Sequence, residues 1–225
     1  MEIGAGLGSL TRALAEGDAH VLAVEFDRAL IPALSEAVAD LPNVEIRQAD
    51  ATSVEWNELL GDGAWKAAAN LPYNVAVPIL LHALETAPGI EEYVVMVQRE
   101  VAERLSAEPG SELYGPTSLR VAYRADTEIL RNVPPSVFWP RPHVGSSVIR
   151  LRTHATRVSV DADALFRVID VAFAERRKTM RSALRRLGVD ADGVAEVLRS
   201  TEIDPDARPE SLPLDRFAAL AEVVG

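Results

Sequence analysis

The N-terminal part of the chain alternates between buried-strand patterns and helical periodicity, and this alternation limits the fold more than any other feature. The strand-like segments are His20–Val24, Val44–Arg47, Ala64–Ala69 and Glu92–Val97. Apolar residues at helical spacing occupy stretches between them. Because such alternation produces a parallel sheet covered by helices on both faces, we predict an α/β fold.

The C-terminal part has a different pattern. Two further strands are predicted at Thr127–Val133 and Ser147–Leu151, on either side of a proline-rich stretch that cannot be a central strand. From about Asp161 the pattern is helical to the end of the chain, with breaks at Gly188 and around Pro205 to Pro213. We therefore predict two domains: residues 1–154 form the α/β domain, and residues 155–225 form a small all-helical domain.

Composition excludes several kinds of chemistry. The 225-residue chain has no cysteine, so disulfides, thiolate catalysis and cysteine-bound metals are excluded. Its four histidines lie far apart in the sequence, and we expect no metal site. No apolar run reaches the roughly 18 residues of a transmembrane helix, and the start does not resemble a signal peptide. We expect a cytoplasmic monomer with no membrane association.

The net charge of −11 argues at first against a nucleic-acid partner, because phosphate binding depends on Lys and Arg. The acidic excess lies in residues 1–150, however, whereas residues 151–225 hold 12 basic and 13 acidic side chains. One cluster there has six cations and no acid: Arg176, Arg177, Lys178, Arg181, Arg185 and Arg186. On a helix, Arg177, Arg181 and Arg185 share one face. We predict that this cluster contacts an RNA backbone; a solvated charged face is the alternative.

Glycines or polar residues stand at the predicted ends of four strands. They are Gly4 and Gly6 in a glycine-rich loop, Glu25, Asp50 and Asn70. In open α/β sheets, ligands bind at the carboxyl ends of the strands. Glu25 can accept hydrogen bonds from both hydroxyls of a ribose, and Asp50 can accept one from an adenine amine, with Ala51 leaving room beside it. Each residue alone also fits a turn or a helix cap, but together they indicate a nucleoside cofactor.

The quartet Asn70-Leu71-Pro72-Tyr73 follows the fourth of these strands. Pro72 biases Leu71 away from the helical region, which leaves the Leu71 carbonyl free to face a ligand. The Asn70 side chain adds a second acceptor, and the Tyr73 ring offers a stacking surface. These groups suit the capture of an amino group on a flat base. The plainer interpretation is a polar turn with a core tyrosine.

The same motifs, in the same order, resemble those of the small-subunit rRNA adenine N6,N6-dimethyltransferase family, the dimethyladenosine transferases that use S-adenosylmethionine. The resemblance runs from Glu2–Gly8 through Asn70–Tyr73 and Pro134–Val144 to Phe173–Leu184. It implies a Rossmann-like methyltransferase sheet followed by a helical rRNA-binding domain. It also implies dimethylation of two adjacent adenosines near the 3′ end of small-subunit (16S) rRNA, in an immature 30S particle during ribosome biogenesis.

The resemblance assigns roles to individual residues. The family's cofactor positions fall on Gly4, Glu25, Asp50 and Asn70, and Gly6 and Phe26 are expected in the same pocket. The resemblance further implies that Asn70 and the Leu71 carbonyl hold the adenine amine. Tyr73 and Phe138 would then enclose the extruded base.

Three alternatives remain open. Family members carry an N-terminal segment with a Gln-Asn-Phe-Leu-like element that closes over the cofactor, whereas only Met1-Glu2-Ile3 precede the glycine loop here. We therefore expect the chain to be N-terminally truncated and to bind S-adenosylmethionine weakly or not at all, so a catalytically impaired assembly factor is one alternative. A nicotinamide-dependent dehydrogenase leaves Asn70–Tyr73 unexplained. A related 23S rRNA adenine N6-methyltransferase would usually have Ile in place of Leu71.

Overall fold

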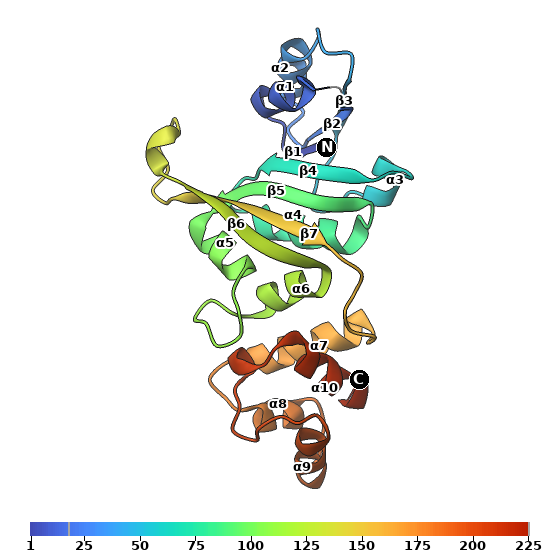
Figure 1. The fold of residues 1–225 in the computed structure, drawn as a ribbon, viewed down its shortest axis with the longest axis vertical. Coiled ribbons are helices and arrows are strands. Elements are labelled where there is room, and N and C mark those ends of the chain that lie inside the picture. Colours follow the sequence, from blue (N-terminus) through green and yellow to red (C-terminus); the bar gives the residue numbers. More distant parts are fainter. Residues whose placement is uncertain (18, 225) are drawn as a thin grey trace. The chain divides into compact units, whose positions relative to one another are not determined.

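A computed structural model describes residues 1–17 and 19–224, which form two compact units (Figure 1). The sheet unit comprises residues 1–102 and 125–154, and the helical unit comprises residues 103–124 and 155–225. The packing thus groups residues 103–124 with the helices, although the sequence pattern assigned them to the first domain. The division of the chain into functional domains at residue 154 stays a prediction.

The sheet unit is built on seven strands in the order β3-β2-β1-β4-β5-β7-β6. The strands are β1 (Glu2–Ile3), β2 (Val21–Glu25), β3 (Val44–Gln48), β4 (Trp65–Asn70), β5 (Ile90–Gln98), β6 (Ala125–Val133) and β7 (Ser146–Thr153). The helices that connect the first five are α1 (Ser9–Ala15), α2 (Ile31–Ala37), α3 (Trp56–Leu60) and α4 (Ala76–Thr86), and α5 (Arg99–Leu105) follows β5. The first five strands pair in parallel, as their sequence pattern predicts.

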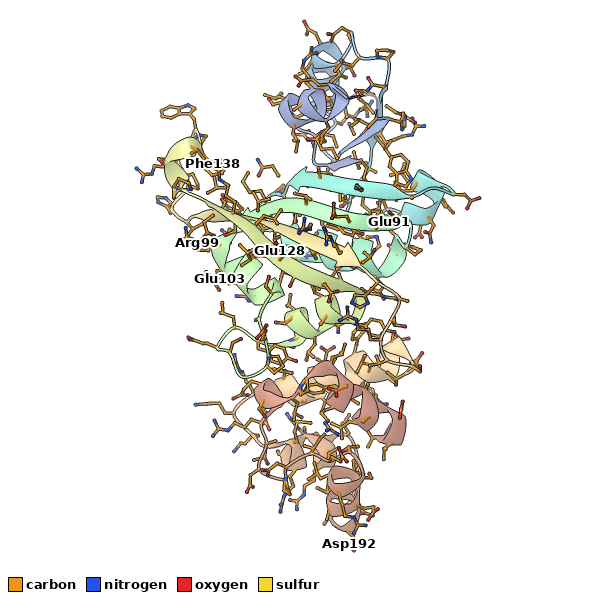
Figure 2. The ribbon with its side chains drawn as sticks, viewed as in Figure 1. Glu91, Arg99, Glu103, Glu128, Phe138 and Asp192 are labelled. Carbon is orange, nitrogen blue, oxygen red and sulfur yellow. The ribbon has the colours of Figure 1, made fainter. Side chains whose placement is uncertain are left out.

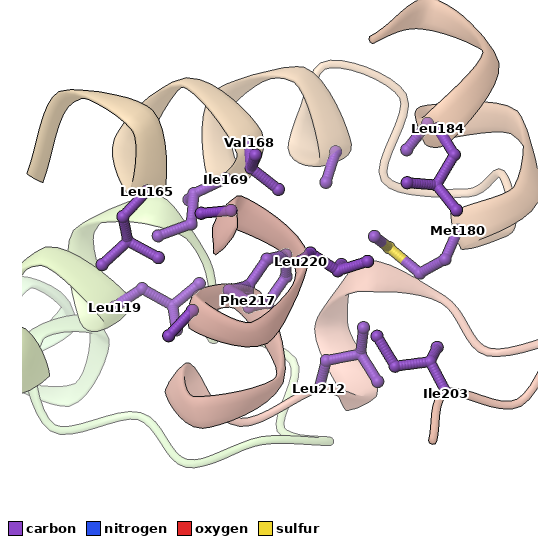
Figure 3. Packing of buried hydrophobic residues seen from close by; sticks show 14 of the residues in the cluster. Leu119, Leu165, Val168, Ile169, Met180, Leu184, Ile203, Leu212, Phe217 and Leu220 are labelled. Atoms are coloured by element: carbon purple, nitrogen blue, oxygen red, sulfur yellow. The ribbon is translucent and has the colours of Figure 1, made fainter. Parts of the chain in front are cut away.

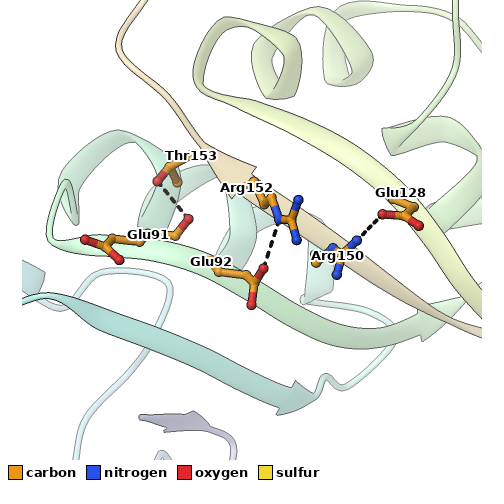
Figure 4. A network of polar contacts seen from close by, with 6 residues as sticks. All are labelled: Glu91, Glu92, Glu128, Arg150, Arg152 and Thr153. Atoms are coloured by element: carbon orange, nitrogen blue, oxygen red, sulfur yellow. Dashed lines mark hydrogen bonds and ion pairs between the residues drawn. The ribbon is translucent and has the colours of Figure 1, made fainter.

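Strand β7 breaks the parallel order, because it pairs antiparallel with both β5 and β6. Its side chains add polar contacts to both neighbours (Figure 4). Arg152 Nε lies 3.1 Å from Glu92 on β5, and Arg150 pairs with Glu128 on β6. The hydroxyl of Thr153 donates to the Glu91 carbonyl over 3.1 Å. The last strand in sequence therefore occupies an interior position of the sheet.

The two faces of the sheet differ in burial. Alternate residues of β4, β5 and β7 point to one face, where Ala67, Val95 and Ile149 are almost fully buried. The intervening residues of these strands point to the opposite face, where they are partly or fully exposed and border a hollow of about 560 Å³. Its lining includes Leu10, Leu14, Ala68, Val94, Met96 and Val148. No helix in residues 1–17 or 19–224 fills this hollow, so the prediction of helices on both faces is wrong for this part of the sheet.

The helical unit has its own apolar core (Figure 3). It contains α6 (Pro116–Arg124), α7 (Ala162–Phe173), α8 (Met180–Arg186), α9 (Ala191–Ser200) and α10 (Leu214–Val224). Leu119 of α6, Leu165 of α7 and Phe217 of α10 are all fully buried in this core. The predicted helical C-terminal part is confirmed, and helices end before the predicted breaks at Gly188 and around Pro205 to Pro213.

Candidate active site

The glycine-rich loop after β1 is held by a carboxylate. Gly4 and Gly6 both adopt positive φ angles, 76° and 57°, which L side chains rarely tolerate. The Gly6 N–H donates to Glu25 Oε2 over 2.8 Å, and the Asp27 N–H donates to Glu25 Oε1 over 2.8 Å. Glu25 is buried at the end of β2. Its two oxygens are thus fixed, and each retains acceptor capacity for a ligand hydroxyl.

Asp50 is fixed by the residue two positions further on. Its Oδ1 accepts hydrogen bonds from the Thr52 N–H at 2.9 Å and from the Thr52 hydroxyl at 2.7 Å. These bonds hold the pKa of Asp50 below its ordinary value. The residue is therefore a carboxylate at neutral pH, and its Oδ2 has no donor among the described residues. Ala51 beside it is buried and has no bulk to block a flat ring.

A cavity of about 430 Å³ joins these strand ends. Its lining is largely apolar and includes Gly4, Gly6, Glu25, Phe26, Asp50, Ala51, Leu71, Pro72, Val75 and Ile79. Glu25 and Asp50 supply its two carboxylates, while Phe26 is 68% exposed at its edge. An apolar cavity with a few fixed polar groups is typical of a small-molecule site. The structure brings all of the predicted cofactor residues except Asn70 to this cavity.

Asn70 instead lines a second cavity of about 290 Å³, with Leu71, Pro72, Tyr73, Phe138, Trp139, Pro140 and Pro142. No donor in the described part of the chain contacts the Leu71 carbonyl or the Asn70 side-chain oxygen, although the Leu71 N–H donates to the Met96 carbonyl over 3.1 Å. Two acceptors therefore remain for a ligand. The structure brings together the whole predicted quartet with Phe138, which lies on the β6–β7 loop (Figure 2).

The aromatic residues of this second cavity are positioned separately. The Tyr73 hydroxyl lies 2.8 Å from Oγ of Ser146, which is fully buried on β7. Phe138 follows a 3₁₀ turn at Pro135–Val137. The rings of Tyr73 and Phe138 line the same cavity, but among the described residues they do not contact each other. The space between them is therefore open to a ligand. Leu71 and Pro72 line both cavities, so the two spaces share a wall.

The cationic cluster of the helical unit differs from its predicted form. Helix α8 begins at Met180, so Arg176, Arg177 and Lys178 lie in the turn before it. The prediction that one helix face carries Arg177 together with Arg181 and Arg185 is wrong, because α7 ends at Phe173 and the intervening residues form turns.

Carboxylates neutralise part of this cluster. Arg176 Nε lies 3.7 Å from Glu210, and Arg186 lies 3.3 Å from Glu175. Arg177, Lys178, Arg181 and Arg185 are exposed and pair with no carboxylate in the described part of the chain. Four cations therefore remain available for phosphates.

Comparison with known proteins agrees with the resemblance that the sequence motifs indicate. The sequence pattern of the family described as ribosomal RNA adenine dimethylase matches residues 1–224. The chain belongs to this family. A protein of Streptomyces avermitilis named ribosomal RNA small subunit methyltransferase A is 42% identical over 99% of this chain and 77% of its own length. A protein of the same name from Moorella thermoacetica is 40% identical over 100% of this chain and 82% of its own length.

Solved structures agree in fold. A dimethyladenosine transferase from Plasmodium falciparum has a TM-score of 0.82 and 22% identity, covering 97% of this chain and 86% of its own. The 23S rRNA methyltransferase ErmE has a TM-score of 0.70 and 24% identity, covering 98% and 88%. Family membership confirms the Rossmann-like sheet and the enzyme class, an S-adenosylmethionine-dependent rRNA adenine dimethyltransferase.

Several residues of the site had not been identified from the sequence. Thr52 could have been found, because a hydroxyl residue two positions after an aspartate is a common turn signal. Ser146 could not, since it is 73 residues from Tyr73. Among the described residues there is no cluster of three or more metal-ligating side chains, and no helix is long and apolar enough to span a membrane.

Proposed function

We propose that this chain methylates N6 of two adjacent adenosines near the 3′ end of small-subunit rRNA, using S-adenosylmethionine, on an immature 30S particle during ribosome biogenesis. The observation that carries the proposal is the wall of Leu71 and Pro72 that two cavities share. The cavity with Glu25 and Asp50, here called the cofactor cavity, has the carboxylates for a nucleoside cofactor. The cavity with Asn70 and Tyr73, here called the acceptor cavity, has the acceptors for an adenine amine. We further propose that the enzyme acts as a cytoplasmic monomer.

The proposed cofactor cavity fits S-adenosylmethionine in its donor set. Glu25 would accept hydrogen bonds from the two ribose hydroxyls, and the free oxygen of Asp50 would accept one from the adenine amine. Apolar side chains such as Val75 and Ile79 would contact the purine ring. When bound, this cofactor supplies a methyl group on a sulfonium, which is the group transferred.

The acceptor cavity addresses the weakness of an adenine amine as a nucleophile. The nitrogen lone pair is delocalised into the purine ring, so the nitrogen must pyramidalise before it attacks a methyl group. Acceptors on Asn70 and Leu71 would hold both N–H bonds and favour that geometry, while Tyr73 and Phe138 enclose the base. Positioning of this kind contributes about 7–11 kcal/mol to lowering a bimolecular barrier. The proton can leave after transfer, so no general base is required.

Two rounds of transfer require that the site also accept a monomethylated base. After the first transfer, one N–H remains for a single acceptor, and the new methyl group needs space. Among the described residues, no donor occupies the position beside the Asn70 side-chain oxygen or the Leu71 carbonyl. The open acceptors are therefore compatible with dimethylation.

The four unpaired cations of the helical unit would contact the rRNA backbone. Arg177 and Lys178 precede α8, and Arg181 and Arg185 lie on it. Phosphate binding needs such local cations even in a protein of net charge −11. The contact would position the substrate without reading its sequence.

The test is methyl transfer by an Asn70→Ala variant. Immature small subunits, an rRNA 3′ fragment and large-subunit rRNA are incubated separately with radiolabelled S-adenosylmethionine, and the labelled nucleosides are identified. Wild type is expected to give dimethyladenosine at two adjacent positions, a result that would overturn the expectation from the sequence that the chain binds S-adenosylmethionine weakly or not at all. Asn70→Ala is expected to lower kcat by about 10²- to 10³-fold, as for loss of one transition-state contact. Asn57→Ala on α3 is the control. Label found only in large-subunit rRNA would favour the 23S alternative, and RNA binding without transfer would favour an assembly factor.

A further inference from the structure

Trp139 is the most exposed large apolar side chain among the described residues, at 98%, and it also lines the acceptor cavity. The other two tryptophans differ: Trp56 is fully buried, and Trp65 is half-buried with its Nε1–H bonded to the Leu60 carbonyl over 3.1 Å. A fully exposed indole at the rim of a site leaves a large aromatic surface unpartnered.

The backbone separates Trp139 from the base that Phe138 would contact. Phe138 is extended, with φ −104° and ψ 148°. Consecutive side chains of an extended segment point to opposite sides. The two rings are therefore presented in different directions, and that of Trp139 lies exposed at the rim of the cavity that both residues line.

The surroundings of Trp139 suit RNA rather than a basic or apolar protein surface. No acidic residue occurs between Glu128 and Asp161, although the chain as a whole is strongly acidic. Arg141 and His143 are exposed in the same loop. Pro140 and Pro142 restrict this loop, so little conformational freedom is lost when a ligand binds.

We infer that Trp139 stacks on the nucleotide next to the adenosine held in the acceptor cavity. Extruding one base from a strand leaves the adjacent base without a stacking partner on one side. An exposed indole replaces that partner, as aromatic side chains do in single-stranded RNA recognition. This inference rests on the proposed function and adds a binding residue for the second of two adjacent adenosines.

The test uses short single-stranded RNAs that differ only beside the target adenosine. One carries two adjacent adenosines, and the other has an abasic site in place of the neighbour. For the first RNA, Trp139→Ala is expected to weaken binding about tenfold, the size of one lost base–aromatic stack, whereas Trp139→Phe retains most of the affinity. For the abasic RNA, wild type and Trp139→Ala should bind equally. Because the ring is exposed, neither substitution should change the melting temperature.

Tryptophan fluorescence supplies a second readout. The adjacent-adenosine RNA should quench the emission of wild type and of a Trp65→Phe control, and should leave Trp139→Phe unquenched. Equal weakening of both RNAs by Trp139→Ala would overturn the inference, as would unchanged binding of both. Weakened binding to immature small subunits without weakened binding to the RNA would also overturn it, because the ring would then contact another component. If wild type neither binds nor methylates any RNA, the proposed function fails as well.

Discussion

The hydroxyl of Tyr73 and Oγ of Ser146 lie 2.8 Å apart, although the two residues belong to the β4–α4 connection and to β7. Ser146 is fully buried, so its hydroxyl cannot turn to solvent for another partner. The bond fixes the edge of the Tyr73 ring, and with it the face that lines the acceptor cavity. Ring position is thus set from a strand that takes no direct part in the proposed chemistry.

Removing this bond should weaken catalysis modestly. Ser146→Ala and Tyr73→Phe are each expected to lower kcat/KM about fivefold, because one hydrogen bond contributes about 1 kcal/mol. The double variant should lose no more than either single variant, since both remove the same bond. Ser147→Ala is the matched control, because the Ser147 hydroxyl bonds to Asn132 Oδ1 over 2.7 Å instead. Additive losses in the double variant would contradict this coupling.

Glu25→Gln should weaken cofactor binding. An amide cannot accept from both the Gly6 and the Asp27 N–H groups, so one of these donors would face an N–H₂ group. We expect the affinity for S-adenosylmethionine to fall about tenfold or more, with a loss of folding free energy of about 1–3 kcal/mol. Calorimetric titration and denaturant unfolding measure the two effects. Glu36→Gln, at an exposed position of α2, should change neither, and unchanged affinity in Glu25→Gln would remove this residue from the site.

Glu2 should make stability fall as pH rises. Burial, partly opposed by the Thr11 hydroxyl, raises the pKa of this carboxyl from 4.5 to about 7. Between these values the folded state retains a proton that the unfolded state has lost, so stability decreases with pH across this window and is level on either side.

A Glu2→Gln variant isolates this contribution. It should lose the pH dependence and exceed wild type in stability above pH 7, on the order of 2 kcal/mol, while matching it below pH 4.5. Urea unfolding across this range measures the difference. A constant offset between the variant and wild type at every pH would show that Glu2 is not the titrating group.

The cations before and on α8 should determine the salt dependence of RNA binding. Replacing Arg177, Lys178 and Arg181 with Ala is expected to reduce the slope of log K against log salt by about two to three, because each lost phosphate contact removes about one. Arg199→Ala is the control, since Arg199 pairs with Glu196 on α9. A triple variant with the wild-type slope would place the RNA elsewhere.

Features that depend on neighbouring residues were predictable from the sequence. The parallel strands and the residues at their ends follow from local pattern, so Gly4, Glu25 and Asp50 reach one cavity as expected. The quartet at Asn70 keeps its acceptors free because Pro72 acts on the residue beside it.

Features that depend on tertiary contacts were not predictable. Helix α3 has only five residues, too few for helical periodicity to be distinguished. The break between α7 and α8 falls in a basic stretch whose helical pattern continues in the sequence. The bond between Tyr73 and Ser146 and the exposure of Trp139 depend on where the β6–β7 loop and the start of β7 lie in the folded chain. No local sequence pattern predicts that position.

The interior position of β7 sets the order in which the molecule can be completed during translation. Strand β6 is synthesised before β7, yet it pairs with the sheet only through β7. Until Ser146–Thr153 has left the peptide exit tunnel, β6 has no neighbour, Phe138 lies on a loop attached at one end, and Tyr73 lacks its buried partner. A nascent chain of this protein therefore cannot complete the acceptor cavity before β7 has emerged from the ribosome.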